Sequence, residues 1–237
     1  MTAVTVGIHQ PNFFPWMGFF DKMARSDVFV LLDDVQFPKG GGTYTNRVEL
    51  LLNARRSWVT APQDRNYAGV RTILEMRFAE QDDWRQRIIR SLSPNFGKHP
   101  YFDETMEVLE PLVRNVDSRI ANYNITALTA IASRLGLLEG KRIVRASDVN
   151  VAATGTERLA LLTRRVGGTT YLAGGGAAGY QEDEVFGRHG VDLQFQSFVH
   201  PVYTQRRTPV FEPGLSVIDA AMNLGWEGVG SLLRSAS

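Results

Sequence analysis

The sequence predicts an α/β fold built on a mostly parallel sheet. At the amino-terminal end of the 237-residue chain, a short apolar run, a proline-rich loop, an amphipathic stretch and a second apolar run follow one another. They fit within about 30 residues, which is the length of one βαβ unit. The last third of the chain again alternates short apolar runs with helical patterns. Together these observations favour a Rossmann-like sheet in a single α/β domain over residues 1–237, with a helical insert at about 80–138.

The first βαβ unit is expected to bring two loops to one edge of the sheet. Its strand, helix and strand are expected at Val4–Ile8, Trp16–Ala24 and Val28–Leu32. Pro11 and Pro15 exclude regular structure between the first strand and the helix, so an ordered loop is expected there. A right-handed crossover places the ends of both strands, with His9, Asp33 and Asp34, on the same edge.

The remaining elements follow from apolar spacing. The expected strands of the middle region are Arg47–Leu52, Ser57–Ala61 and Ile73–Phe78. The expected helices of the insert are Asp82–Leu92, Phe102–Val113 and Ser118–Leu135. The alternation then resumes with a strand in 141–149, a helix in 156–168, a strand in 169–176, a helix at Glu182–His189, a strand at Val191–Phe198 and a helix at Leu215–Leu224.

Composition narrows the class of protein. A net charge of +1 provides no strong field toward nucleic acid or a membrane, so neither is expected as a partner. The chain has no cysteine, which excludes thiolate nucleophiles, disulfides and Cys-ligated metal sites. We see no signal peptide and no apolar run of the roughly 18 residues that cross a bilayer. A soluble, cytoplasmic protein is therefore expected.

The segment VGIHQPNFFPWMGFFDK contains the first candidate site. His9 ends the predicted strand, and the amides of Gln10 and Asn12 follow it. The prolines and Trp16 would hold this loop still, and a positioned imidazole is what general base catalysis requires. A histidine at a strand end can equally be a packed structural residue, so the role of His9 stays open on this pattern alone.

Polar residues after the second strand form another group. Asp33 or Asp34 could orient His9, bind an ammonium group or hold Mg²⁺ through water, or the two could simply cap a turn. The loop DDVQFPKGGGTYTNR adds four polar candidates for binding an anion or carboxylate, unless it is only a solvated loop. They are Gln36, Lys39, Asn46 and Arg47.

Two later motifs add candidates. The run YLAGGGAAGY contains Gly174, Gly175 and Tyr180, and its small residues would let a ligand approach the backbone, although a tight turn explains them as well. It matches neither a P-loop nor a dinucleotide fingerprint. The run FVHPVYTQ places His200 and Tyr203 after a strand and repeats the pattern of the opening segment. A metal held by two histidines and an aspartate is an open alternative, but we expect no metal site.

These motifs resemble those of the WbqC-like family of bacterial proteins, which occurs in O-antigen and natural-product gene clusters. The resemblance rests on HQPNFFPWMGFFDK, DVFVLLDDVQFPK followed by NR, YLAGGGAAGY, FVHPVYTQ and LSVIDAAMNLG, and so covers nearly the whole chain. It implies that aminoacyl, for example glycyl, transfer to an amino sugar is a candidate activity. The residues at motif positions are His9, Asp33, Asp34, Lys39, Asn46, Arg47, His200 and Tyr203.

A looser likeness concerns the fold alone. The start of the chain is similar to the nucleotidylyltransferase superfamily, which includes the ATP-dependent ligase pantothenate synthetase. The paired-histidine signature of that superfamily is missing here, because Phe14, Pro15 and Trp16 stand in its place. ATP use is therefore not expected, and a shared fold by itself does not define the chemistry.

The leading hypothesis is an acyltransferase that forms an amide bond. His9 would act as general base on the amine, and Asp33 or Asp34 would orient His9 or bind the ammonium. Arg47 and Lys39 would hold a phosphate or carboxylate of a substrate. The donor would be activated, for example as a thioester on coenzyme A or a carrier protein, and a small amine or amino sugar would accept the acyl group.

In the leading hypothesis, His200 and Tyr203 would polarise or position the acyl carbonyl, and no cofactor is needed when the donor is a thioester.

Two alternatives remain beside this hypothesis. The first alternative is an ATP-dependent ligase or a nucleotidyltransferase-like enzyme. The second is a non-catalytic module that binds a sugar nucleotide or a carrier protein.

Overall fold

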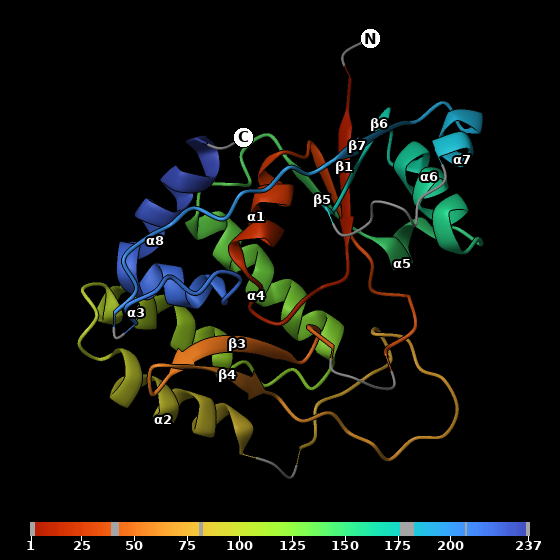
Figure 1. Ribbon diagram of the computed structural model, residues 1–237. Helices are drawn as coiled ribbons and strands as arrows, with labels where there is room; N and C mark the ends of the chain where they lie inside the picture. The colour runs from red at the N-terminus through yellow and green to blue at the C-terminus, as the bar shows by residue number, and fades with distance from the viewer. Residues whose placement is uncertain (1–2, 39–42, 81–82, 176–182, 207, 236–237) are drawn as a thin grey trace.

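A five-stranded parallel sheet forms the centre of the fold. The computed structural model describes residues 3–38, 43–80, 83–175, 183–206 and 208–235 (Figure 1). The strand order is β5–β2–β1–β6–β7, and every neighbouring pair is parallel. The strands are β1 (Thr5–His9), β2 (Val28–Leu31), β5 (Arg142–Arg145), β6 (Thr170–Ala173) and β7 (Asp192–Phe195). The predicted Rossmann-like α/β fold is confirmed.

The strand order reverses between β1 and β6. The chain runs outward from β1 through β2 to β5, returns to β6 on the other side of β1, and continues outward to β7. Val6 of β1 therefore pairs with Val28 on one side and with Tyr171 on the other. In open α/β sheets, ligands bind beyond the carboxyl ends of the strands at such a reversal. We call the β1–β6 junction the switch point.

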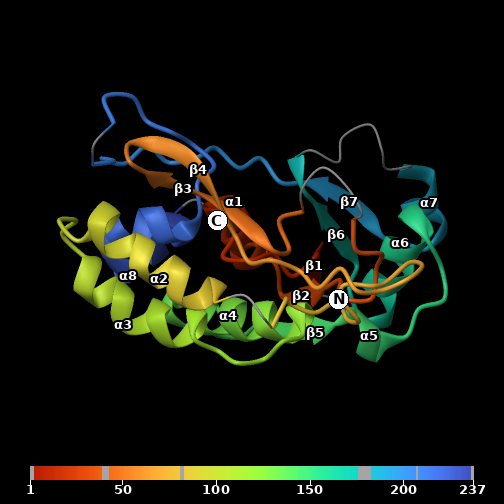
Figure 2. The same cartoon turned by 90° about the horizontal axis from the view of Figure 1, so that it is seen from below.

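Helices cover both faces of this sheet (Figures 1 and 2). One face carries α1 (Met17–Ala24), α4 (Ile120–Arg134) and α8 (Val217–Ser235), and the other carries α5 (Ala146–Val149), α6 (Gly155–Arg165) and α7 (Asp183–Arg188). Successive side chains of a strand point to opposite faces. Phe29 of β2 accordingly lies in the core with α1 and α4, whereas Val28 and Val30 lie in the core with α6.

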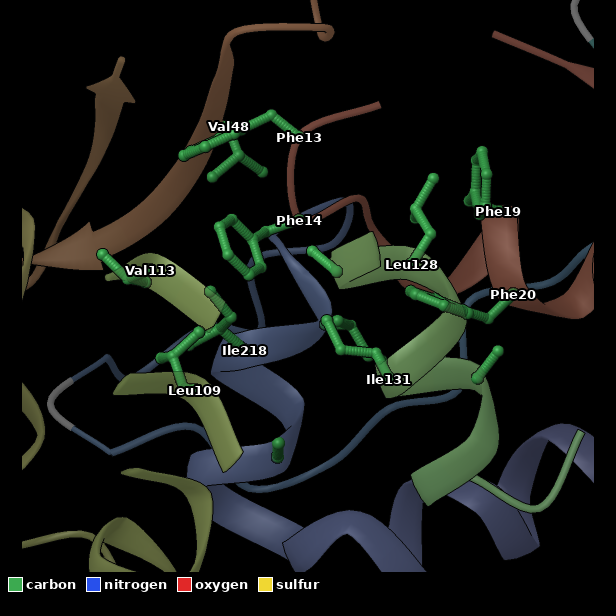
Figure 3. Packing of buried hydrophobic residues seen from close by; sticks show 14 of the residues in the cluster. Phe13, Phe14, Phe19, Phe20, Val48, Leu109, Val113, Leu128, Ile131 and Ile218 are labelled. Atoms are coloured by element: carbon green, nitrogen blue, oxygen red, sulfur yellow. The ribbon is translucent and has the colours of Figure 1, made fainter. Parts of the chain in front are cut away.

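The larger core extends beyond the sheet. It is completed by α2 (Trp84–Phe96), α3 (Phe102–Val113) and the antiparallel hairpin of β3 (Arg47–Leu52) and β4 (Arg55–Thr60). Figure 3 shows Phe13 and Phe14 packed among Val48 of β3, Leu109 of α3 and Ile218 of α8. These two aromatic residues of the loop between β1 and α1 are thus core residues, and their packing fixes the loop to the core.

One predicted strand is wrong. The segment Ile73–Phe78 contains turns and isolated bridges instead, because the backbone N–H of Met76 donates to the nearby carbonyls of Thr72 and Ile73 rather than to a neighbouring strand. Thr72 and Glu75 also exchange local hydrogen bonds, and such side-chain bonds compete with a strand ladder. Its apolar residues are buried, which explains the strand-like pattern.

The other predicted elements are present with shifted bounds. The helix predicted at Leu215–Leu224 continues to Ser235, with a kink at Gly225, whose φ is +71°. A glycine tolerates this left-handed backbone, so the chain can bend and continue there. The three helices expected between residues 80 and 138 all form, between β4 and β5 in the sequence.

In the described part of the chain, no helix is both long enough and apolar enough to cross a membrane.

Candidate functional site

Two cavities meet at the end of β1. The switch-point cavity has a volume of about 500 Å³ and lies beyond β1 and β6. Its lining comprises Ile8, His9, Trp16, Gly18, Phe19, Lys22, Tyr171, Gly174, Gly175, Gln196 and Phe198. The hairpin cavity, of about 390 Å³, is lined by His9, Asn12, Trp16, Tyr44, Glu49, Arg56 and Gly214. Both volumes are in the range of small-molecule sites, and His9 and Trp16 belong to both linings.

His9 is a neutral imidazole with a fixed tautomer. Its Nδ1 lies 3.0 Å from the carbonyl oxygen of Gln10, and because a carbonyl can only accept, Nδ1 carries the proton. The lone pair is therefore on Nε2. Burial and the positive charge of Lys22 lower the pKa of His9 to about 4. The ring packs edge-on against Phe19, with centroids 4.9 Å apart.

Trp16 divides the two cavities. Its indole lies over Gly18, where an added Cβ would be only 2.5 Å from the ring, so the glycine makes room for it. The indole also stacks on His200, with centroids 6.2 Å apart, and packs edge-on against Phe198. His200 thus contacts Trp16 but is not among the described residues that line either cavity.

The loop between β1 and α1 is held from both ends, as the prolines predicted. The Nδ2 of Asn124 on α4 donates to the carbonyl oxygens of Pro11 (2.8 Å) and Thr45 (2.7 Å). The hydroxyl of Ser216 donates to the carbonyl of Phe14, which has a φ of +42°. A left-handed non-glycine residue is strained, and it persists because the surrounding contacts determine it.

Lys22 lines the switch-point cavity but was not among the candidate residues predicted from the sequence. Its side chain is 3% exposed and its Nζ donates to the carbonyl of Ile8 at 2.8 Å. The same Nζ lies 5.5 Å from the centroid of the Tyr171 ring. Burial lowers the pKa of Lys22 to about 8. The sequence feature that indicates its burial is the run FFDKM. This helix is apolar around most of its circumference, so a lysine on it has little solvent-exposed surface to occupy.

Tyr203 and His200 belong to a neighbouring network. The hydroxyl of Tyr203 donates to Asp219 Oδ2 at 2.8 Å, and the Nε2 of Gln205 lies 3.2 Å from the same oxygen. His200 packs against the rings of Tyr203 and Phe211. Burial lowers the pKa of His200 and raises that of Asp219 to about 6. These contacts tie the 196–214 segment to α8.

The two aspartates after β2 bind other side chains. Asp33 is fully buried and accepts from Arg145 Nε at 2.8 Å and from the backbone and hydroxyl of Ser147. Asp34 forms an ion pair with Arg158 of α6. The ring nitrogen of His9 that we expected one of them to orient is bonded to a backbone carbonyl instead.

The remaining candidates are distributed as follows. Gly174 and Gly175 line the switch-point cavity, as the glycine run suggested. Asn46 bonds the carbonyl of Ala61, and the guanidinium of Arg47 lies 4.0 Å from the centroid of the Trp58 ring, so both stabilise the hairpin region. The backbone carbonyl of Gln10 fixes His9. Gln36 is exposed and forms a bridge with Thr72, whereas Lys39 and Tyr180 lie outside the described residues.

The arrangement offers two neighbouring cavities that share Trp16 and a neutral imidazole in their linings. The switch-point side has a buried ammonium, and the hairpin side has the Glu49 carboxylate paired with Arg56 at 2.7 Å. Within the ranges that the structure covers, there is no group of three or more histidines or acidic residues that could hold a metal ion.

Comparison with known proteins places this architecture in a family. The model of the WbqC-like protein family matches residues 10–230. The chain is also 28% identical over 226 residues to "Uncharacterized protein Rv1507c" of Mycobacterium tuberculosis (strain ATCC 25618 / H37Rv), covering 94% of each chain. No solved structure shows significant similarity. The match includes the loop after β1, the cavity-lining residues other than Ile8 and His9, and most of α8. The resemblance noted in the sequence is confirmed: the chain belongs to the WbqC-like protein family.

Proposed function

We propose that this protein forms amide bonds by transferring an acyl group, such as an aminoacyl group, from an activated donor to an amine. The observation that carries the proposal is the position of His9, a neutral imidazole on the wall shared by two cavities. A transferase that joins two substrates directly needs both of them beside one proton-transferring group.

The linings favour one assignment of the two substrates. The hairpin cavity contains the Glu49 carboxylate and the ring of Tyr44, which is 56% exposed. Glu49 already pairs with Arg56 of the same lining, so an ammonium is attracted by the aromatic face and by the acceptor sites that Arg56 leaves on the carboxylate. The switch-point cavity, with its buried ammonium and two glycines, suits the donor.

His9 supplies the proton transfer. The bound ammonium first releases one proton to solvent, and the free amine nitrogen then attacks the acyl carbon, so that a C–N bond forms and the C–S bond of a thioester donor breaks. The proton that the nitrogen loses goes to His9 Nε2, whose lone pair is unprotonated at neutral pH, and then to the departing sulfur, which leaves as a thiol. A base of low pKa suffices here because the nitrogen becomes strongly acidic once the C–N bond forms.

The roles assigned to other residues change accordingly. The Gln10 carbonyl takes the orienting role first given to Asp33 or Asp34, since it accepts from Nδ1 of His9. Trp16 separates the two substrates and exposes 38% of its surface. Ser, Thr or Lys would be needed for a covalent acyl-enzyme, and direct transfer between adjacent cavities requires none of them.

Mass spectrometry of the amide product tests the proposal. Purified protein is offered aminoacyl thioesters with a panel of small amines and amino sugars, with and without ATP and Mg²⁺. Product from thioester without ATP supports acyl transfer. Product only from free amino acid, ATP and Mg²⁺ replaces it with a ligase. Binding of amines without any product in either arm replaces it with a binding module.

A further inference from the structure

Lys22 presents an unbalanced buried charge. Its side chain is 3% exposed, and in the described part of the chain no carboxylate forms an ion pair with it. Its contacts are the Ile8 carbonyl and the face of the Tyr171 ring, both neutral. An ammonium removed from water without a counter-charge is costly, so a protein keeps one mainly where a ligand or a reaction uses it.

Among the residues that the structure describes, nearby charges do not supply the missing counter-charge. Asp21, the adjacent residue on α1, binds Arg25 at 3.0 Å and also accepts from the Nε2 of Gln196. His9, which also lines the cavity, is neutral. Among the described residues that line the cavity, Lys22 therefore provides a positive charge at pH values below about 8.

The start of α1 adds to this positive potential. The cavity lining includes Trp16 and Gly18 at the beginning of the helix, whose first turn contains no acidic residue and whose N-cap has no side-chain hydrogen bond. Lys22 lies five residues after the first residue of the helix, which is about 7.5 Å along the helix axis. Helical side chains lean toward the N-terminus, so the Lys22 ammonium and the start of the helix both contribute positive potential to the cavity. Helix N-termini attract anions.

Gly174 and Gly175 place backbone without side chains in the lining of the same cavity. A Cβ added at Gly174 would have no atom of the described residues within 4 Å, so these residues leave the backbone there uncovered. A bare backbone can come within hydrogen-bond distance of ligand oxygens. Several donors arranged around one volume suit a tetrahedral phosphate, with its several oxygens, better than a planar carboxylate.

We infer that Lys22 anchors a phosphate-binding site in the switch-point cavity, which takes a phosphate ester or diphosphate carried by the ligand. Coenzyme A and a nucleotide share this chemistry. Assigning the phosphate to an acyl donor rests on the proposed function, whereas phosphate binding itself does not.

Calorimetric titration with inorganic pyrophosphate tests the site. We expect wild-type protein to bind it and Lys22→Met to bind it roughly 10- to 100-fold more weakly, the usual loss for one charge-assisted hydrogen bond. Lys141→Met is the matched control, because Lys141 also donates to backbone carbonyls, those of Ala24 and Ser26, but does not line the cavity. Equal affinity in Lys22→Met and wild type, or no wild-type binding at millimolar pyrophosphate, would overturn the inference, as would tighter binding of acetate.

A second measurement needs no variant. The chain has four lysines, Lys22, Lys39, Lys98 and Lys141, so amine labelling can be resolved by peptide mass spectrometry. Pyrophosphate should slow labelling of Lys22 severalfold and leave Lys98 and Lys141 unchanged; unchanged labelling of Lys22 contradicts the site. Coenzyme A and ADP, as competitors, then identify the source of the phosphate. Phosphate binding without amide product keeps this inference and removes the proposed function, and product without phosphate binding does the reverse.

Discussion

The Nζ of Lys22 donates a 2.8 Å hydrogen bond to the carbonyl oxygen of Ile8, so the ammonium lies beside the end of the strand that carries His9. The two groups are electrostatically coupled, because the charge of Lys22 contributes to the lowered pKa of His9. An anion on Lys22 would offset that charge and raise the pKa of His9 toward its ordinary value. We therefore expect anion binding beside Lys22 to make His9 more basic, while burial continues to hold its pKa below 6.5.

Anion binding should weaken as pH rises through about 8, where Lys22 loses its proton. Only the ammonium form offers a charge, so affinity should fall about tenfold per pH unit above that value. Sulfate is the appropriate probe, because its own charge is constant over this range. His9 is already neutral there, so it does not contribute to the profile. A flat calorimetric profile between pH 7 and 10 in wild type would contradict the role of Lys22, and Lys141→Met should retain the wild-type profile.

His9→Ala should reduce amide formation by about 10²–10⁴-fold, the contribution of a positioned general base. Affinity for pyrophosphate should change little, since Lys22 and the glycines remain. His189→Ala is the matched control, because His189 pairs with Glu157 on the α6–α7 side and lines neither cavity. Product yield measured by mass spectrometry distinguishes the two variants. Full activity in His9→Ala would exclude proton transfer by this residue.

Much of the fold was predictable because apolar spacing is a local signal. Continuous apolar runs such as Val28–Leu31 marked buried strands, and the prolines beside His9 marked the loop. The strand predicted at Ile73–Phe78 was wrong, because buried residues outside a strand ladder produce the same apolar pattern as a strand.

Residues of the candidate site could be predicted only where their position at a strand end, or in the loop after it, is enough to bring them to the cavity. His9, Trp16, Gly174 and Gly175 lie at strand ends or in the loops that follow them, and all four line the switch-point cavity. The partners of Asp33, in contrast, are Arg145 and Ser147, more than a hundred residues away in the chain, and no local pattern identifies them.

Gly18→Ala should disturb both cavities without touching a polar group. The new Cβ would lie 2.5 Å from the Trp16 ring and displace it. We expect amide formation to fall by about 10²-fold, because small displacements of positioning groups have effects of this size. Gly187→Ala in α7 is the control: a Cβ there meets no atom within 4 Å, and replacing a helical glycine by alanine should stabilise the fold by about 0.5–1 kcal/mol. Equal activity of the two variants would show that the position of Trp16 is unimportant.

Asp33→Asn should reduce stability more than catalysis. The substitution removes the charge from bonds with Arg145 and Ser147, and loss of charge-assisted hydrogen bonds at a buried group costs about 2 kcal/mol. Thermal denaturation should show a lower midpoint, while kcat/KM below that midpoint stays near the wild-type value. An unchanged melting temperature with lost activity would instead support the catalytic role first considered for Asp33.

Asp219 should make stability depend on pH in an unusual direction. Burial raises its pKa from 3.8 to about 6, so between these values the folded state holds a proton that the unfolded state has released. The stabilisation is complete below pH 3.8 and is lost as pH rises to about 6, by about 3 kcal/mol at most. His9 acts in the opposite sense, because its lowered pKa makes stability fall as pH drops below 6.5.

The difference between wild type and Asp219→Asn isolates the Asp219 contribution from that of His9. The free energy of unfolding is measured by urea denaturation at several pH values between 4 and 7, with Asp192→Asn as the control for an exposed carboxylate. Wild type should lose stability relative to Asp219→Asn as pH rises through this interval, and Asp192→Asn should run parallel to wild type. Asn cannot ionise but still accepts from Tyr203 and Gln205, so the contacts that hold the 196–214 segment on α8 are kept. Parallel curves for wild type and Asp219→Asn would mean that Asp219 is ionised throughout, with Tyr203 and Gln205 stabilising its charge against burial.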